Sequence, residues 1–326
     1  MTENKIALLT GGAGFIGSHL VDRLVAGGWY TKIIDNFSSG RWENLLHHKD
    51  NQNVEVVKGD LRSFKTCMKI IEDVEVVFHF AANPEVRVST IHPKVHFDNN
   101  VVTTFNLLEA IRQKGSVKAL VFASSSSVYG EPESIPVDES APLRPVSVYG
   151  ASKVACESLI HAYCELYGIR TVILRYANVI GPRLRHGVVF DFVCKLRRNP
   201  RKLEILGDGS QIRSYLHVSD AVEAALIAYK ELGKHFEELN VGNVDWITVK
   251  DVAALVSKAL GLSNVTYTFK PVLHGVGWPG DVKRICLSIE RIKSKGWKPT
   301  KNSRIAVMLT AKDLNKELNE YESRTP

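Results

Sequence analysis

KIALLTGGAGFIG, residues 5–17, is the stretch that decides the fold of this chain. Its apolar first half predicts a short strand, and the helical spacing of apolar residues from Phe15 to Ala26 predicts the helix that follows. The glycines between them permit a tight turn and a close approach of the backbone to a phosphate group. A helix N-terminus also attracts negative charge. The pattern therefore predicts a dinucleotide-binding turn, although a glycine-rich turn without a ligand is the simpler alternative.

An aspartate at the end of the second predicted strand specifies the dinucleotide. The carboxylate of Asp35 is placed to accept hydrogen bonds from both hydroxyls of an adenosine ribose. It would repel a 2′-phosphate, so we expect NAD rather than NADP as the cofactor. Asp60 follows the third predicted strand, where it either accepts a hydrogen bond from the adenine amino group or caps the next helix.

Outward from this turn, strand-like runs alternate with helical segments. Near-continuous apolar strands separated by helices are typical of a parallel sheet with helices on both faces. We expect an α/β fold: a doubly wound parallel sheet of the Rossmann type, with a smaller C-terminal α/β lobe that binds the substrate. The expected strands are 5–10, 31–34, 54–57, 75–80, 118–123, 170–174 and 203–206, and the expected helices 15–26, 63–71, 99–114, 149–167, 188–198, 219–232 and 248–260.

The same pattern predicts two domains. Residues 1–177 are expected to form the NAD-binding Rossmann domain and residues 178–326 the substrate lobe. Residues 215–243 are expected to return to the Rossmann domain. The polar tail at 315–326 is expected to be loosely held.

Composition excludes several classes of protein. The 326 residues are 44% hydrophobic and 24% charged, with a net charge of +7, as in ordinary globular domains. No apolar run is long enough to span a membrane, and no secretory leader is evident. Five scattered cysteines argue against a disulfide framework and against a zinc site, so we expect a cytoplasmic protein without a metal. The basic residues between Arg183 and Lys202 are not interleaved with aromatic residues, so we expect no nucleic-acid partner.

A second motif supplies candidate catalytic groups. Tyr149 and Lys153 are four residues apart at the start of a predicted helix, which places them on one face. A nearby ammonium group favours the phenolate and makes a tyrosine a better general base. The alternative is an exposed pair on a helix surface. Ser124–Ser127 end the fifth predicted strand, where a hydroxyl either contacts the substrate or satisfies its own backbone.

Taken together, these motifs resemble the extended short-chain dehydrogenase/reductase family, in particular its nucleotide-sugar epimerases of the UDP-glucose 4-epimerase type. The matching stretches are TGGAGFIGSHL, DNFSSG, GDL, HFAA, FASSSSVYG, PVSVYGASK, RYANVIGPR, GDGSQIRSYLHVSD and WPGDV. The resemblance implies reversible C4 epimerisation of a UDP-hexose, UDP-glucose or UDP-galactose, through a transient 4-keto sugar. It implies Tyr149 as the base, Lys153 as its partner and Ser125 as the catalytic hydroxyl.

The resemblance also implies the remaining binding residues and a homodimer. The expected cofactor residues are Gly11, Gly14, Phe15, Ile16, Gly17, Asp35, Asn36, Ser38, Gly40, Asp60, Leu61, Ala81, Ala82, Asn100, Ser124, Tyr149, Lys153 and Tyr176. The expected substrate residues are Val86, Ser125, Ser126, Tyr149, Asn178, Arg185, Val189, Leu203, Arg213 and Asp281.

Alternatives stay open at this point. Arg185 resembles an arginine that UDP-glucuronate 4-epimerases use for the sugar carboxylate, and UDP-N-acetylglucosamine is a further alternative substrate. A non-catalytic protein that binds NAD or a nucleotide sugar is the alternative of a different class. Related dehydratases carry an acidic pair where this chain has Ser126 and Ser127, so we expect neither loss of water nor loss of carbon dioxide.

Overall fold

The computed structural model describes residues 5–233, 235–271 and 277–324, and the chain forms two compact units. The first unit comprises Met1–Val128, Ser147–Arg175 and Val222–Leu239. The second comprises Tyr129–Val146, Tyr176–Ala221 and Asn240–Pro326. The predicted domain boundaries stay a prediction.

A seven-stranded sheet forms the centre of the fold, in the order β11-β6-β5-β4-β1-β2-β3. β1 pairs in parallel with β2 on one side and with β4 on the other, and the pairs β2–β3 and β4–β5 are also parallel. The sheet therefore confirms the predicted doubly wound fold, and the chain reverses its direction of winding between β1 and β4. The strands are β1 (Ile6–Thr10), β2 (Tyr30–Asp35), β3 (Val54–Lys58), β4 (Val76–His79), β5 (Ala119–Ser125), β6 (Arg170–Tyr176) and β11 (Phe236–Val241).

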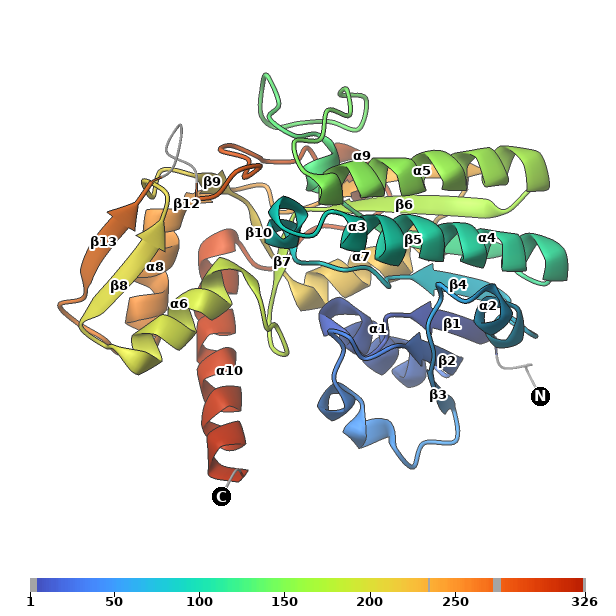
Figure 1. The fold of residues 1–326 in the computed structure, drawn as a ribbon, viewed down its shortest axis with the longest axis horizontal. Coiled ribbons are helices and arrows are strands. Elements are labelled where there is room, and N and C mark those ends of the chain that lie inside the picture. The colour runs from blue at the N-terminus through green and yellow to red at the C-terminus, as the bar shows by residue number, and fades with distance from the viewer. Residues whose placement is uncertain (1–4, 234, 272–276, 325–326) are drawn as a thin grey trace. The chain divides into compact units, whose positions relative to one another are not determined.

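Helices cover both faces of this sheet (Figure 1). α2, α4 and α5 pack against one another on one face. On the other face, an ion pair of 2.8 Å between Arg23 and Glu223 joins α1 to α7. The helices and helical turns are α1 (Phe15–Ala26), η1 (Trp42–Asn44), η2 (Leu46–His48), α2 (Phe64–Ile70), η3 (Val86–Thr90), α3 (Lys94–His96), the π-helix η4 (Phe97–Val102), α4 (Thr103–Lys114), η5 (Ser126–Val128), α5 (Val148–Tyr167) and α7 (Val218–Lys230).

The core lies between the sheet and these helices. Leu8, Val77 and Leu120 of the strands are buried together with Ile111 of α4 and Ile160 of α5. The strands are apolar on both faces because helices cover both, which is why they read as continuous apolar runs in the sequence.

The second unit contains three two-stranded sheets, β10–β7, β12–β9 and β13–β8. Within it, α10 packs against α6 and α8 (Figure 1). β11 of the central sheet, the strands of these three small sheets other than β8, and every helix after residue 260 were not predicted from the sequence. The elements are β7 (Asn178–Ile180), α6 (Gly187–Arg198), β8 (Lys202–Leu206), β9 (Ile212–Arg213), β10 (Tyr215–His217), β12 (Ile247–Thr248), α8 (Val249–Ala259), β13 (Thr266–Lys270), α9 (Glu290–Ser294) and α10 (Ser303–Arg324).

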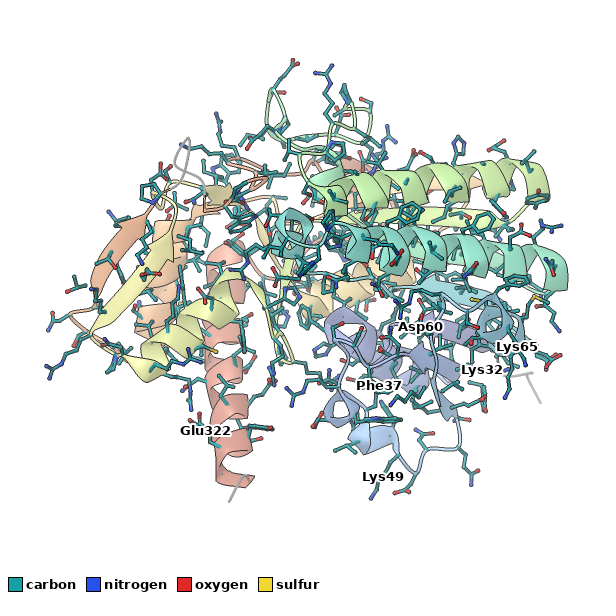
Figure 2. The ribbon with its side chains drawn as sticks, viewed as in Figure 1. Lys32, Phe37, Lys49, Asp60, Lys65 and Glu322 are labelled. Carbon is teal, nitrogen blue, oxygen red and sulfur yellow. The ribbon has the colours of Figure 1, made fainter. Side chains whose placement is uncertain are left out.

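The expectation of a loose tail at 315–326 is wrong for the residues that the structure describes, because α10 continues to Arg324. Arg197 of α6 holds the last turns of α10. The guanidinium donates to the side chains of Asn315 and Asn319, each at 2.6 Å, and to Glu322 at 2.7 Å. Figure 2 shows Glu322 on α10. The tail is polar because its partner is a cation rather than an apolar core.

No helix among the described residues is both long enough and apolar enough to cross a lipid bilayer.

Arg197→Ala tests this end of the helix. Loss of a charged hydrogen-bonding group that is partly shielded from water should cost about 1 kcal/mol of stability. We expect faster hydrogen exchange confined to residues 315–322, measured by mass spectrometry. The matched control is Arg198→Ala, because Arg198 is exposed at the next position of the same helix. Equal hydrogen exchange of residues 315–322 in the two variants would show that Arg197 does not hold the end of α10.

Candidate active site

The glycine-rich turn lies against the end of β4. Gly11 has a φ of +70°, and a Cβ on it would lie 2.8 Å from the backbone of Ala81. A Cβ on Gly17 would lie 2.2 Å from the carbonyl oxygen of Gly11. Only glycine fits at these two positions, and the turn is consequently held at the point where the sheet changes its direction of winding.

The first turn of α1 is left open to a ligand. Its N-cap, Gly14, has no side chain to satisfy the first amides, and the first turn carries no acidic residue. The N-terminal amides of a helix have no partners within the helix, and its dipole favours an anion there. The turn and the helix end therefore fit the pyrophosphate of a dinucleotide.

Asp35 ends β2 and is fixed by two backbone amides. Its Oδ2 accepts from Ala13 N at 3.0 Å, and its Oδ1 accepts from Phe37 N at 2.8 Å. Burial raises the pKa of Asp35, and these two hydrogen bonds act in the opposite direction. Among the described residues, the structure gives this carboxylate no ion pair with a lysine or arginine. A buried carboxylate held in this way fits the hydroxyls of a ribose, and the contact of Asp35 with them stays a prediction.

Asp60 is already paired. Its carboxylate accepts from the Arg62 guanidinium at 2.7 Å, and Asn36 donates to it at 3.4 Å. The hydrogen bond from Arg62 holds the pKa of Asp60 below its ordinary value. Ser63, not Asp60, is the N-cap of α2, so the helix-cap alternative for Asp60 is wrong. Its contact with adenine stays a prediction. Figure 2 shows Phe37 and Asp60 on the loops that follow β2 and β3.

Tyr149 lies in the first turn of α5 beside the end of β5. Ser147 begins this helix by accepting a hydrogen bond from Gly150 N at 3.1 Å. Burial raises the pKa of Tyr149 to about 12, and a hydrogen bond with the Ser125 hydroxyl opposes this shift. Ser125 Oγ also lies 2.9 Å from Ser127 Oγ. The structure therefore brings together the two hydroxyls that the sequence predicted as catalytic.

Lys153 is buried one turn further along α5, so the alternative of an exposed surface pair is wrong. Its ammonium donates to the carbonyl oxygen of Ala123 at 2.8 Å and lies 6.0 Å from the centre of the Tyr149 ring. Burial lowers the pKa of Lys153 to about 8, and the nearby Cys156 and Glu157 oppose this shift. A lysine with such a pKa is able to exchange a proton near neutral pH.

Asn100 connects the catalytic helix to the loop after β4. Its side-chain amide donates to Ser152 Oγ at 2.8 Å, and Ser152 Oγ donates to the carbonyl oxygen of Tyr149 at 2.7 Å. Asn83 N donates to Asn100 Oδ1 at 3.0 Å. Ser152 and Asn83 were not predicted from the sequence, since nothing local shows that they meet Asn100.

A buried histidine was also missed. His79 Nδ1 lies 2.7 Å from Thr10 Oγ1, and its Nε2 lies 2.9 Å from Thr104 Oγ1. Thr10 Oγ1 in turn accepts from Ala81 N at 3.1 Å. Burial lowers the pKa of His79 to about 3, so the ring is neutral and ties the ends of β1 and β4 together. The sequence signal that could have revealed this network is that each of the two apolar strands ends in a polar residue, Thr10 in β1 and His79 in β4.

Among the other predicted residues of the first unit, Ser124 is occupied by a contact within the protein. The Ser124 hydroxyl donates to Glu157, which forms a buried ion pair of 2.8 Å with Arg175, so this hydroxyl is occupied. The remaining predicted residues lie at strand ends, in helix starts or in loops: Phe15, Ile16, Asn36, Ser38, Gly40, Leu61, Ala81, Ala82, Val86 and Ser126.

The second unit contains Arg213 and Asp281, which form a shielded ion pair of 2.8 Å. Arg213 also donates to the carbonyl oxygens of Ile212 at 2.8 Å and Lys283 at 3.2 Å. Burial raises the pKa of Asp281, although Arg213 acts in the opposite direction. The guanidinium is thus held in one orientation by partners on two segments.

The other predicted residues of this unit are partnered or enclosed. Arg185 forms an ion pair of 2.8 Å with Glu317 of α10. The side-chain amide of Asn178 donates to the carbonyl oxygen of Ser214 at 3.2 Å. The hydroxyl of Tyr176 donates to the carbonyl oxygen of Ala221 at 3.0 Å. The side chains of Val189 and Leu203 are fully buried.

Comparison with known proteins agrees with this site. Residues 7–242 match the NAD dependent epimerase/dehydratase family. A crystal structure of a UDP-galactose 4-epimerase is 49% identical, with a TM-score of 0.84 over 96% of this chain and 99% of that one. A Methanocaldococcus jannaschii protein with the provisional name UDP-glucose 4-epimerase is 40% identical over 90% of this chain and 92% of its own length.

A Bacillus cereus UDP-glucuronic acid 4-epimerase, solved with UDP-glucuronic acid and NAD, is 29% identical with a TM-score of 0.87 over 96% of this chain and 99% of that one. The chain belongs to the NAD-dependent epimerase/dehydratase family. NAD is therefore its cofactor, as the sequence predicted.

Asp35→Ala tests the selection of NAD. The substitution removes the acceptor for the ribose hydroxyls and the negative charge that repels a 2′-phosphate. We expect NAD to bind at least about tenfold more weakly, a loss of about 1.4 kcal/mol, while NADP loses less. Fluorescence titration measures both constants, and Asp50→Ala, at an exposed aspartate, is the control. Equal affinity of the unmutated protein for both cofactors would contradict the role of Asp35.

Lys153→Met tests the buried ammonium through stability. The pKa of Lys153 is lowered from 10.5 to about 8 in the folded chain. Between these values the unfolded chain holds a proton that the folded chain lacks, so the free energy of unfolding rises with pH. We expect the unmutated protein to gain stability relative to the variant from about pH 8 to about pH 10, by at most about 1.4 kcal/mol per pH unit. Urea denaturation measures this difference, and a difference independent of pH would contradict it.

Proposed function

We propose that this protein catalyses the reversible C4 epimerisation of a UDP-hexose, interconverting UDP-glucose and UDP-galactose. The observation that carries the proposal is the constellation at the start of α5. Tyr149 meets the Ser125 hydroxyl, and the buried Lys153 lies one turn away. This constellation belongs to the same unit as the glycine turn and Asp35. The similarity to epimerases of UDP-sugars supports the same activity.

Tyr149 acts as the general base for the 4-hydroxyl of the sugar. With a pKa of about 12, the phenol does not ionise alone at neutral pH. Positive charge beside it favours the phenolate, and Lys153 supplies part of that charge. Ser125 hydrogen-bonds to the tyrosine hydroxyl and is placed to donate to the same sugar oxygen. Bound NAD would supply an acceptor and donor of hydride for C4 of the sugar.

Several residues hold the base in position. Asn100 and Ser152 fix the backbone at Tyr149 through two hydrogen bonds of 2.8 and 2.7 Å. Ser89 Oγ accepts from Tyr149 N at 3.2 Å. A base that is held from several elements loses little entropy when the substrate hydroxyl arrives.

The diphosphate of the substrate is assigned to Arg213. Its guanidinium is already oriented by Asp281 and by backbone carbonyl groups. Asp281 neutralises part of its charge, so we infer that the pair orients the arginine at some cost in attraction for the phosphates. We assign Asn178 to the substrate as well, on the resemblance of its motif.

The sugar is proposed to be neutral. A glucuronate carboxylate would have to compete for Arg185 with Glu317, which is paired with it at 2.8 Å. This favours UDP-glucose and UDP-galactose over UDP-glucuronate. UDP-N-acetylglucosamine, also neutral, is the second substrate for the test.

A homodimer and a cytoplasmic location complete the proposal. Phe105 of α4 and Tyr167 of α5 are exposed aromatic residues, each within a ring contact of Tyr163. They form an apolar patch on two helices that pack together, which a second copy of the chain would cover. The five cysteines are unpaired, as in a reducing compartment.

The test is a panel of UDP-sugars incubated without added reductant and followed by chromatography with mass spectrometry. We expect UDP-glucose and UDP-galactose to interconvert without a change in mass. Tyr149→Phe removes only the proton acceptor, so it should lower kcat by about 10²- to 10⁴-fold while UDP-sugar binding is kept.

Three outcomes would overturn the proposal. A product lighter by water or carbon dioxide would show different chemistry. Interconversion of UDP-glucuronate alone would show a different sugar. Binding of a UDP-sugar and NAD without turnover would show a non-catalytic protein.

A further inference from the structure

Two histidines and one aspartate converge on the surface of the first unit. Asp22 lies on α1, and His47 and His48 form the end of η2. His47 Nε2 lies 2.7 Å and His48 Nε2 lies 2.8 Å from the same carboxylate oxygen, Asp22 Oδ1. The three ligand atoms lie within 4.8 Å of one another. We propose that Asp22, His47 and His48 bind one divalent transition-metal ion, of which Zn²⁺ is the leading candidate.

The donor set selects the class of ion. Two imidazole nitrogens and one carboxylate oxygen suit Zn²⁺, Ni²⁺ or Cu²⁺, whereas Mg²⁺ and Ca²⁺ prefer oxygen ligands. Ligand distances to Zn²⁺ are about 2.0–2.2 Å, so neighbouring ligand atoms lie about 3.3 Å apart in a tetrahedral site. The observed separations of 2.7 and 2.8 Å need to widen by only about half an ångström. Water supplies the remaining coordination position.

The three side chains are already held together. The side chain of His48 is only 10% exposed and that of Asp22 is 29% exposed, whereas that of His47 is 46% exposed. The two imidazole rings lie 4.1 Å apart between centroids. The ion therefore meets a site that is largely formed and reachable from solvent. Figure 2 shows Lys49, the residue after His48, at the margin of this unit.

Such an ion would join α1 to the segment that follows β2. Asn44 of η1 donates to the carbonyl oxygen of Ala13 at 2.8 Å, and Arg41 N donates to the same oxygen at 3.0 Å. The segment that supports the glycine turn thus ends at the proposed metal ligands. The ion is assigned a structural role that is independent of the epimerase proposal.

Calorimetric titration of the full-length protein with ZnCl₂ tests the site, after treatment with a chelator and without a histidine tag. We expect one Zn²⁺ per chain. His47→Ala should weaken its affinity at least about tenfold, because His47 is the most exposed of the three ligands and its loss disturbs the fold least. Asp22→Asn should weaken it similarly, since it removes the negative charge. The matched control is His161→Ala, because His161 is an exposed histidine beside a carboxylate elsewhere in the same unit.

Two further measurements separate a built site from chance binding. Zn²⁺ should raise the melting temperature of the unmutated protein and slow hydrogen exchange over residues 41–48, and His47→Ala should abolish both effects. Zn²⁺ affinity should fall as the pH is lowered, because protons compete with the metal ion for its ligands. The proposal is overturned if the unmutated protein binds no Zn²⁺, or if His47→Ala and Asp22→Asn bind it as tightly as the control.

Discussion

The close approach of the glycine turn to the end of β4 is the constraint on which the structure depends. At Gly11 no side chain fits, because a Cβ would lie 2.8 Å from the backbone of Ala81. The buried Thr10–His79–Thr104 network holds the same strand ends in register. With these ends fixed, the first turn of α1 is held in place, and the carboxylate of Asp35 is fixed by the amides of Ala13 and Phe37. Cofactor binding is consequently a property of the sheet rather than of a mobile loop.

Burial gives the catalytic pair its character. It raises the pKa of Tyr149 to about 12 and lowers that of Lys153 to about 8, because both charged forms lose their hydration. The hydrogen bond with Ser125 opposes the shift of the Tyr149 pKa, and Cys156 and Glu157 oppose that of the Lys153 pKa. The pair is therefore sensitive to any charge placed beside it. This sensitivity suits a base that must take a proton and later give it back.

In the second unit, two arginines that were predicted to bind the substrate are paired with carboxylates. Arg213 with Asp281, and Arg185 with Glu317, are ion pairs made before any substrate is present. A paired guanidinium is oriented but partly neutralised, so its anion affinity depends on how well a ligand competes with the resident carboxylate. The partner carboxylates, Asp281 and Glu317, thus limit the attraction of these two arginines for an anion.

The sequence by itself predicted the doubly wound sheet, the glycine turn with Asp35, and the Tyr149–Lys153 pair, because each depends on local spacing, whereas Ser125 was implied by the resemblance to the epimerase family. Periodicity predicted Phe15–Ala26 with the bounds that α1 has. It missed β11 of the central sheet, β13 and the whole of α10, whose last polar turns are held by Arg197 on a distant helix. Only the tertiary structure decided that Lys153 is buried, that Glu317 occupies Arg185, and that Asp22 meets His47 and His48. These contacts join residues from separate elements, and no local pattern records which side chains the folded chain brings together.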